Sequence, residues 1–262
     1  MLSFNKIVKK LWKKWWKIVL KKDLFEIIDP EKKDKFKSYL DKDIYKLKSQ
    51  KVIIPIKSWV YIIPDKDDLK LNQIDLLDKY YLKLLKKYIS FNVWSDYFIS
   101  WRKALEIHLK DFSIPEKIFI VNRKLNKKIK VWGYEIIFKT ISWKIEWKKI
   151  NLYSKMSKFT SKKEIEWIKF RVSCLELSLV ESTLISDTFE WVNLSLVNKA
   201  IKKYSKIFDK EIFQEIWKFK YIMAFNRLKE ISRNIDQKLY RLILKIIKNN
   251  GGLFIGEWLR GF

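Results

Sequence analysis

The spacing of hydrophobic residues changes repeatedly in the first 64 positions, and each change predicts a new element. Apolar residues at helical spacing in 4–11 precede a short apolar run at 18–20, and a short helix at 24–28 then follows with Asp23 as its cap. The next helix, at about 35–49, turns four residues to one face: Phe36, Leu40, Ile44 and Leu47. Two β-rich runs, 52–56 and 60–63, are joined by Lys57-Ser58-Trp59 and predict a hairpin whose third turn position suits glycine.

This order of helices and strands is that of a winged helix-turn-helix, whose third helix enters the major groove while the hairpin contacts the adjacent backbone. The side of the 35–49 helix opposite its apolar face is therefore the candidate DNA contact, since one helix fits in the groove. The predicted DNA-binding residues lie on that side and in the hairpin turn: Ser38, Lys42, Tyr45, Lys46, Ser49, Lys57 and Ser58. Two alternatives to DNA contact remain. The lysines could simply form a solvent-exposed helix face, or the module could bind another protein.

After an acidic linker at 65–68, an amphipathic helix is predicted over about 71–88, and the pattern then changes to mixed elements. Strands are predicted at 96–99, 117–121, 134–139, 150–153 and 168–172, with helices at 100–109 and 174–185 capped by Ser100 and Ser173. Further helices are predicted at 194–204, 210–216, 218–234 and 237–248. The expected fold is α+β with a mostly antiparallel sheet. We predict three parts: the winged helix at 1–68, an α+β domain at 69–190 and a helical extension at 191–262.

The net charge of +27 predicts attraction to polyanions, above all to nucleic-acid phosphates. Lysine outnumbers arginine 50 to 7, however, and AAA-rich coding in an AT-rich genome raises lysine content without any function. The net charge is therefore compatible with DNA or RNA binding, but the charge by itself does not establish that function.

Tryptophan and glycine occur in unusual proportions, with 13 Trp against 5 Gly, although glycine normally makes up about 7% of residues. Four tryptophans lie in predicted tight turns, where the backbone favours glycine: Trp59, Trp132, Trp143 and Trp147. We predict that most tryptophans are glycine in the cell, because some bacterial lineages read UGA as glycine. The alternative is a tryptophan-rich protein from an AT-rich genome, and UGG codons at these positions would establish it.

Three stretches of the chain together resemble one family. They are VIIPIKSWVYIIP at 52–64, a middle stretch made of DYFISWRKALEIHL at 96–109, IPEKIFIVNRK at 114–124 and GYEIIFK at 133–139, and FRVSCLELSLVE at 170–181. Their order resembles the AbiEi antitoxins of type IV (abortive infection) toxin-antitoxin systems. The chain departs from that pattern at four positions, where Trp101, Leu175, Ser178 and Glu181 replace Gly, Pro, Ala and Asp.

The resemblance implies a transcriptional autorepressor whose N-terminal module binds inverted repeats in its own promoter. It also implies that the C-terminal part opposes a nucleotidyltransferase-like toxin. A solitary winged-helix regulator without a toxin is the first alternative to this antitoxin function.

Most enzyme classes are disfavoured by what the chain lacks. His108 is the single histidine and Cys174 the single cysteine, so multi-histidine metal sites, intramolecular disulfides and cysteine zinc sites are excluded. No phosphate-cradling glycine loop occurs, so we expect no enzyme, no cofactor and no metal. The remaining enzymatic alternative is a Mg²⁺ nuclease built on Glu146 and Lys148, with Glu135 and Asp96 as further carboxylates.

The N-terminus is lysine-rich and has neither a continuous apolar stretch nor a cleavage site for a signal peptide. No run approaches the roughly 20 apolar residues of a membrane span. We therefore expect a cytoplasmic protein with no membrane partner. The alternative is a basic N-terminal helix that lies on anionic lipid, with Trp12, Trp15 and Trp16 as anchors.

Overall fold

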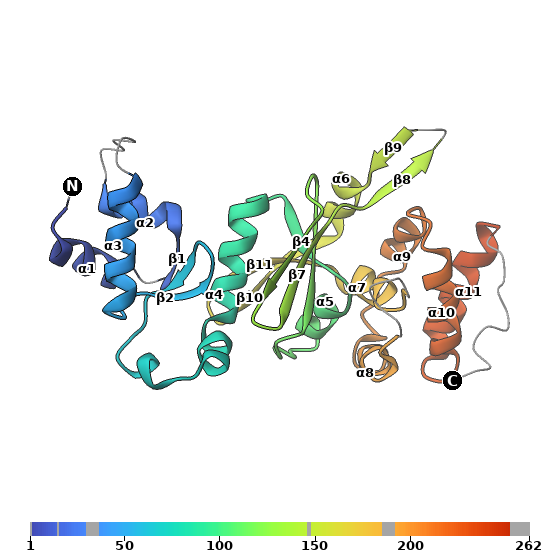
Figure 1. Ribbon diagram of the computed structural model, residues 1–262. Helices are drawn as coiled ribbons and strands as arrows, with labels where there is room; N and C mark the ends of the chain where they lie inside the picture. Colours follow the sequence, from blue (N-terminus) through green and yellow to red (C-terminus); the bar gives the residue numbers. More distant parts are fainter. Residues whose placement is uncertain (1, 15, 30–36, 146–147, 185–191, 252–262) are drawn as a thin grey trace. The chain divides into compact units, whose positions relative to one another are not determined.

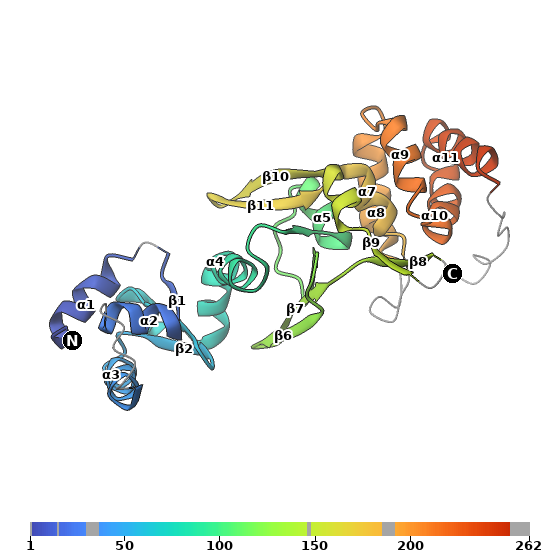
Figure 2. The ribbon, with the colours of Figure 1, turned by 90° about the horizontal axis from the view of Figure 1, so that it is seen from above.

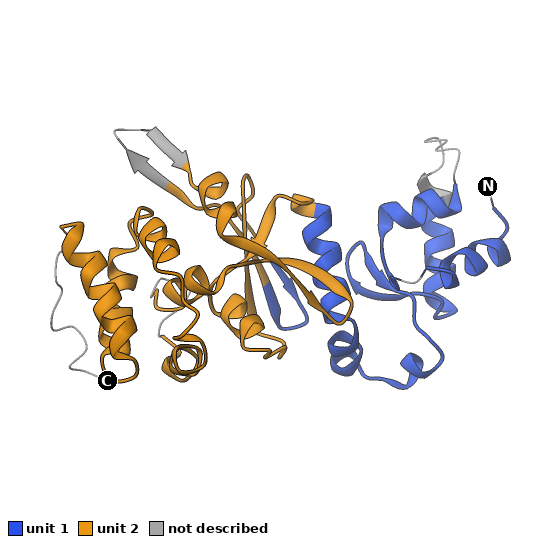
Figure 3. Ribbon diagram, turned by 180° about the vertical axis from the view of Figure 1, so that it is seen from behind, with its two compact units in different colours: residues 1–91, 129–135 blue, residues 92–128, 136–262 orange. Residues whose placement is uncertain are grey.

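The structure, a computed structural model, describes residues 2–14, 16–29, 37–145, 148–184 and 192–251. The chain forms two compact units, one of residues 1–91 with 129–135 and the other of residues 92–128 with 136–262 (Figure 3). The α+β fold class is confirmed. The predicted boundaries after residues 68 and 190 stay predictions.

The first unit begins with the predicted alternation of helices and strands (Figure 1). Its elements are α1 (Phe4–Trp12), β1 (Ile18–Leu20), α2 (Lys21–Ile28), α3 (Lys37–Ser49), β2 (Ile54–Lys57), β3 (Val60–Ile62), the 3-10 turn η2 (Asp67–Lys70) and α4 (Gln73–Val93). The three strands form an antiparallel sheet in the order β1-β3-β2. Three helices followed by a two-stranded ribbon, with β1 closing the sheet, are the winged-helix arrangement.

One hydrophobic core holds this module together. Ile7 and Leu11 of α1, Leu24 of α2, and Ile44 and Leu47 of α3 are all buried in it. The predicted inward face of α3 is thus confirmed, with Leu40 packed at the edge of the cluster. The fourth predicted member, Phe36, lies outside the described residues.

Asp23 does not cap α2 as predicted, because the helix begins at Lys21. Its carboxylate instead reaches back and accepts a hydrogen bond of 2.9 Å from the backbone N–H of Leu20. This is the acidic half of a capping box, which satisfies a backbone donor at the helix start.

The second unit is built on a six-stranded sheet, in the order β10-β11-β4-β5-β7-β6, beside a separate two-stranded ribbon. The strands are β4 (Tyr97–Ile99), β5 (Lys117–Asn122), β6 (Lys127–Val131), β7 (Tyr134–Lys139), β8 (Ser142–Ile145), β9 (Lys148–Asn151), β10 (Thr160–Ile165) and β11 (Ile168–Ser173). β10–β11 and β4–β5 pair antiparallel, whereas β11 and β4 pair parallel through Val172 and Ile99. Part of β6 and β7, residues 129–135, belongs to the first unit.

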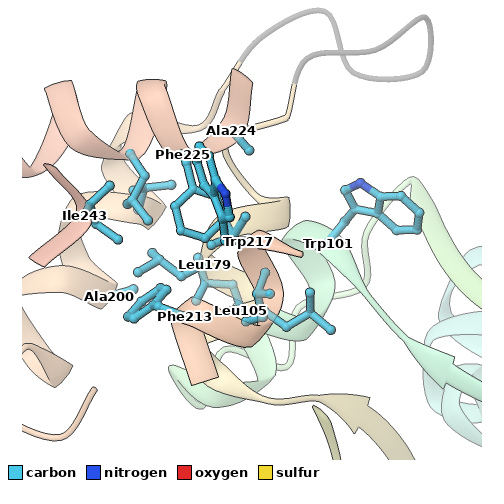
Figure 4. Close-up of a cluster of buried hydrophobic side chains, with 14 of the residues drawn as sticks. Trp101, Leu105, Leu179, Ala200, Phe213, Trp217, Ala224, Phe225 and Ile243 are labelled. Carbon is cyan, nitrogen blue, oxygen red and sulfur yellow. The ribbon is translucent and has the colours of Figure 1, made fainter. Parts of the chain in front are cut away.

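The helices of this unit share one core with the sheet. They are α5 (Trp101–His108), α6 (Tyr153–Met156), α7 (Leu175–Glu181), α8 (Leu194–Tyr204), α9 (Lys210–Trp217), α10 (Ile222–Arg233) and α11 (Gln237–Asn249), with the 3-10 turn η3 (Ser157–Phe159) after α6. Leu105 of α5, Leu179 of α7, Phe213 of α9 and Phe225 of α10 meet there (Figure 4). The predicted C-terminal helices therefore bury their apolar faces in the core that also covers the sheet.

Side-chain caps mark three of these helices and are missing where we predicted two others. Asn193, Asp209 and Asp236 each accept a hydrogen bond from a backbone N–H in the first turn of α8, α9 and α11. Ser100 precedes α5 but its hydroxyl makes no cap bond, and Cys174, not Ser173, precedes α7. The helix predicted at 218–234 begins only at Ile222.

The sequence did not reveal β6, β8 and β10. β6 and β10 carry several lysines, and most of their side chains are exposed or only half buried. Strand assignment there depends on pairing with a neighbour: Lys162 of β10 stands opposite Arg171 of β11. Local propensity carries little of that information, because a strand is stabilised mainly by its cross-strand contacts.

Five tryptophans have a backbone that favours glycine. Among the described residues, ten that are not glycine have positive φ, and half of them are tryptophan: Trp59, Trp94, Trp101, Trp132 and Trp167. Tryptophan provides only 13 of the 262 residues, and a left-handed backbone costs roughly 1–2 kcal/mol for residues with a Cβ. The predicted glycine geometry is confirmed at Trp59 and Trp132.

Three other tryptophans do not support the predicted replacement of glycine. Trp217 ends α9 and packs its indole edge-on against Phe225, with 5.1 Å between ring centroids. The turn predicted around Trp143 is wrong, because this residue lies in β8 opposite Ile150. Trp147 lies outside the described residues.

Candidate nucleic-acid interface

The exposed side of α3 carries most of the residues predicted to contact DNA. Four of them are exposed to solvent: Lys42, Tyr45, Lys46 and Ser49. Tyr45 keeps 73% of its surface accessible, while Ile44 and Leu47 turn inward from the same helix. Figure 2 shows α3 end-on at the edge of the winged helix. The side chain of Ser38 lies outside the described part of the chain.

Neighbouring contacts position this face and reduce the negative charge close to it. The Lys46 ammonium lies 4.5 Å from the centroid of the Phe4 ring, which links α3 to α1. Lys42 has an acidic neighbour on each side: the Asp41 carboxylate pairs at 2.7 Å with Lys21, and Asp43 is half-buried. Ser49 donates its hydroxyl hydrogen to the carbonyl oxygen of Lys46 at 2.9 Å and keeps its oxygen as an acceptor. The result is a helix face dominated by lysine ammonium groups.

The predicted hairpin, β2–β3, forms beside α3 within the same module. Lys57 and Ser58 are exposed, and Trp59 at the turn is 65% exposed with φ of 83°. The Lys57 ammonium donates a hydrogen bond of 2.6 Å to the carbonyl oxygen of Lys130. An ammonium has three donors, so this bond leaves Lys57 able to contact an anion as well. Nothing local in the sequence indicated the contact with Lys130, because 73 positions separate the two residues.

Two carboxylates of the nuclease alternative each lie beside a basic side chain. Asp96 lies 3.7 Å from the Arg123 guanidinium, and Glu135 lies 3.4 Å from the Lys130 ammonium. Glu146 falls outside the described residues. Across the described ranges, no group of three or more His, Cys, Asp or Glu residues could hold a metal ion.

A buried carboxylate lies at the centre of the second unit. Glu181 is fully buried and accepts hydrogen bonds from the Ser100 hydroxyl, the Trp101 backbone N–H and the Tyr221 hydroxyl. Burial raises the pKa of its carboxyl to about 7, against these hydrogen bonds, which lower it. Glu181 thus joins the start of α5 to the end of α7 and to the residue before α10.

This carboxylate predicts that stability falls as pH rises. The Glu181 pKa is 4.5 ordinarily and about 7 in the folded chain, so folding favours the protonated form. The stabilisation is complete below about pH 4.5 and is lost as pH rises through about 7. It amounts to about 3 kcal/mol, at about 1.4 kcal/mol for each pH unit between the two values.

Urea unfolding at pH 5 and pH 8 measures this effect. Between pH 5 and pH 8 the original chain should lose about 2–3 kcal/mol of unfolding free energy that the Glu181→Gln variant does not lose. Glu215→Gln is the matched control, because Glu215 is half exposed and pairs with Lys218 on the surface. Equal behaviour of the two variants would show that Glu181 is not the titrating group.

Three polar residues close to Glu181 in sequence or in space have partners of their own. The Arg171 guanidinium donates hydrogen bonds to the Thr160 hydroxyl at 2.7 Å and to the Ser157 carbonyl at 3.2 Å. Glu176 lies in the first turn of α7, and its carboxylate accepts a hydrogen bond of 2.9 Å from the backbone N–H of Asp209. His108 Nε2 lies 2.8 Å from the Ser173 carbonyl, and burial lowers the pKa of its imidazole.

Comparison with known proteins supports the fold and gives no family. No family model matches the chain, and no curated protein matches it. Among solved structures, the chain is similar to the crystal structure of the RV2827C protein from Mycobacterium tuberculosis. The TM-score is 0.61 at 12% sequence identity, and the match covers 93% of this chain and 80% of that one. At this identity the similarity concerns the fold alone.

No helix among the described residues has both the length and the apolar character needed to cross a membrane.

Proposed function

We propose that the protein is a DNA-binding antitoxin of a type IV toxin-antitoxin system, and that it represses its own operon from the cytoplasm. α3 would enter the major groove and the β2–β3 wing would contact the phosphate backbone. The antitoxin assignment depends on the resemblance to the AbiEi family, whereas DNA binding also has a physical argument.

The observation that carries DNA binding is the exposed lysine face of α3 beside an exposed basic wing. Lys42 and Lys46 are one helical turn apart and exposed, and the carboxylate of the adjacent Asp41 is paired with Lys21. Lys57 and Ser58 are exposed at the adjoining ribbon. Cations on a helix and an adjacent loop can neutralise phosphates on both sides of the groove while Tyr45 and Ser49 meet base edges.

A salt titration with operator DNA tests this function. The ligand is a labelled duplex from the region upstream of the gene, and the control is a duplex of the same composition in scrambled order. We expect log affinity to fall linearly with log salt, at about 0.9 for each neutralised phosphate. Roughly six contacts would reduce affinity about 10³-fold between 50 and 200 mM salt. Absence of binding at 50 mM would reject the proposal, and equal affinity for both duplexes would reject autoregulation.

The toxin partner is tested separately by the neighbouring gene. We expect an adjacent open reading frame to encode a nucleotidyltransferase-like protein that arrests growth when expressed alone, and growth to return when this chain is expressed with it. If operator binding is found and rescue is not, the protein is a solitary winged-helix regulator.

A further inference from the structure

The hairpin β6–β7 contributes residues 129–135 to the first unit, although they lie far from the winged helix in sequence (Figure 3). Its turn residues, Trp132 and Gly133, have φ of 43° and 95°. Positive φ at both central residues is the pattern of a type I′ turn, whose twist matches that of paired strands. The tip is therefore a regular, tight ribbon of the same kind as the wing.

Three contacts fix this tip within the unit. The Tyr134 hydroxyl donates to Asp78 of α4 at 3.2 Å, and its ring lies 5.6 Å from that of Tyr81. On the other strand of the hairpin, the Lys130 carbonyl accepts the hydrogen bond from the ammonium of Lys57. The hairpin is thus held by α4 and by the wing together.

The exposed side of β6 is basic. Ile129 and Val131 are buried, while Lys130 between them is exposed. Lys130 keeps 74% of its side chain accessible and lies 3.4 Å from Glu135, which is 11% accessible. This pair holds the lysine stem on the ribbon and leaves most of the cation in solvent.

We propose that the β6–β7 hairpin is a second basic wing, which extends the contact of Lys57 to further phosphates of the same DNA duplex. The inference rests on the proposed function, because the first wing must itself contact DNA. Each strand of a duplex presents a phosphate about every 3.4 Å along its axis. The Lys57 ammonium lies 2.6 Å from the backbone carbonyl oxygen of Lys130, so the Lys130 side chain starts close to Lys57 and can extend to a neighbouring phosphate of the same strand.

The test compares salt slopes for three variants on one operator duplex. Lys130→Gln should reduce the slope of log affinity against log salt by about 1, for the one phosphate contact that is lost. The Lys42→Gln/Lys46→Gln variant tests the proposed function. The control for net charge is Lys238→Gln/Lys245→Gln, which changes two exposed lysines of α11 in the other unit. In addition, Glu135→Gln should raise affinity, because it removes a carboxylate from the edge of the DNA contact.

The outcomes separate the two proposals. If the α3 variant has a reduced slope and the hairpin variant keeps that of the control, the second wing is wrong and the proposed function stands. If the α3 variant also equals the control, the proposed function fails, and the second wing fails with it. A length series gives an independent check: shortening the duplex from one end should weaken binding by the original chain before it weakens binding by the hairpin variant.

Discussion

Reversing the charge of Lys42 and Lys46 on α3 is expected to reduce affinity for operator DNA by more than about 100-fold at 0.1 M salt. One phosphate contact contributes a slope of about 0.9, which near 0.1 M corresponds to roughly eightfold in affinity, and two contacts multiply to about 60-fold. Glutamates at these positions would also repel the phosphates, which increases the loss. Fluorescence anisotropy of a labelled duplex measures the change.

The control reverses two other exposed lysines. Lys238→Glu/Lys245→Glu changes the net charge equally but places it on α11 of the second unit, so we expect only a small loss of affinity. Equal losses in both variants would mean that binding follows total charge and has no localised surface. Lys46→Glu also removes the contact with the Phe4 ring at 4.5 Å, so thermal unfolding of each variant should accompany the binding curves.

Replacing three exposed tryptophans by glycine is expected to raise the free energy of unfolding by about 2–3 kcal/mol. Trp59, Trp94 and Trp167 are 65%, 79% and 90% exposed and have φ of 83°, 54° and 65°. Their side chains bury little surface, whereas the left-handed backbone costs roughly 1–2 kcal/mol at each position and glycine relieves it. Part of the gain is offset by the greater freedom of glycine in the unfolded chain.

Thermal unfolding of the triple variant should show a midpoint higher by roughly 5–10 °C, at about 2–4 °C for each kcal/mol. The same three positions changed to alanine should gain little, because alanine has a Cβ and keeps the strain. Trp12→Gly is the opposite control: Trp12 is 59% exposed but ends α1 without positive φ. A glycine there should destabilise by up to about 1 kcal/mol. A triple glycine variant that unfolds earlier than the original would contradict the predicted glycine identity of these sites.

Recoding of UGA as glycine would also restore family-like residues. Trp101 begins α5 with φ of 54°, at the position where the resemblance expects glycine. The centroid of its indole lies 5.1 Å from that of the Phe119 ring. Glycine at this position would remove that aromatic contact. The codons at the five positive-φ tryptophans remain the direct measurement.

The order of elements in the winged helix could be predicted from sequence, because each depends on short-range periodicity. Leu40, Ile44 and Leu47 define one side of α3 by their spacing alone, and that choice also determines which lysines point outward. The C-terminal helices follow for the same reason, with Asn193, Asp209 and Asp236 as local cap signals. The glycine-favouring turns at Trp59 and Trp132 were likewise local, since two neighbouring strands and their connection suffice to indicate them.

Only the tertiary structure decided which distant segments meet. The Lys57 bond to Lys130 and the hydrogen bonds of Ser100 and Tyr221 to Glu181 each join residues at least 40 positions apart. β10 is a strand because β11 pairs with it, although its lysines give it no apolar pattern. Sequence therefore determined the elements that short-range spacing specifies. Long-range pairing and burial, which carry no local pattern, decided the sheet edges, the buried carboxylate and the hairpin beside the wing.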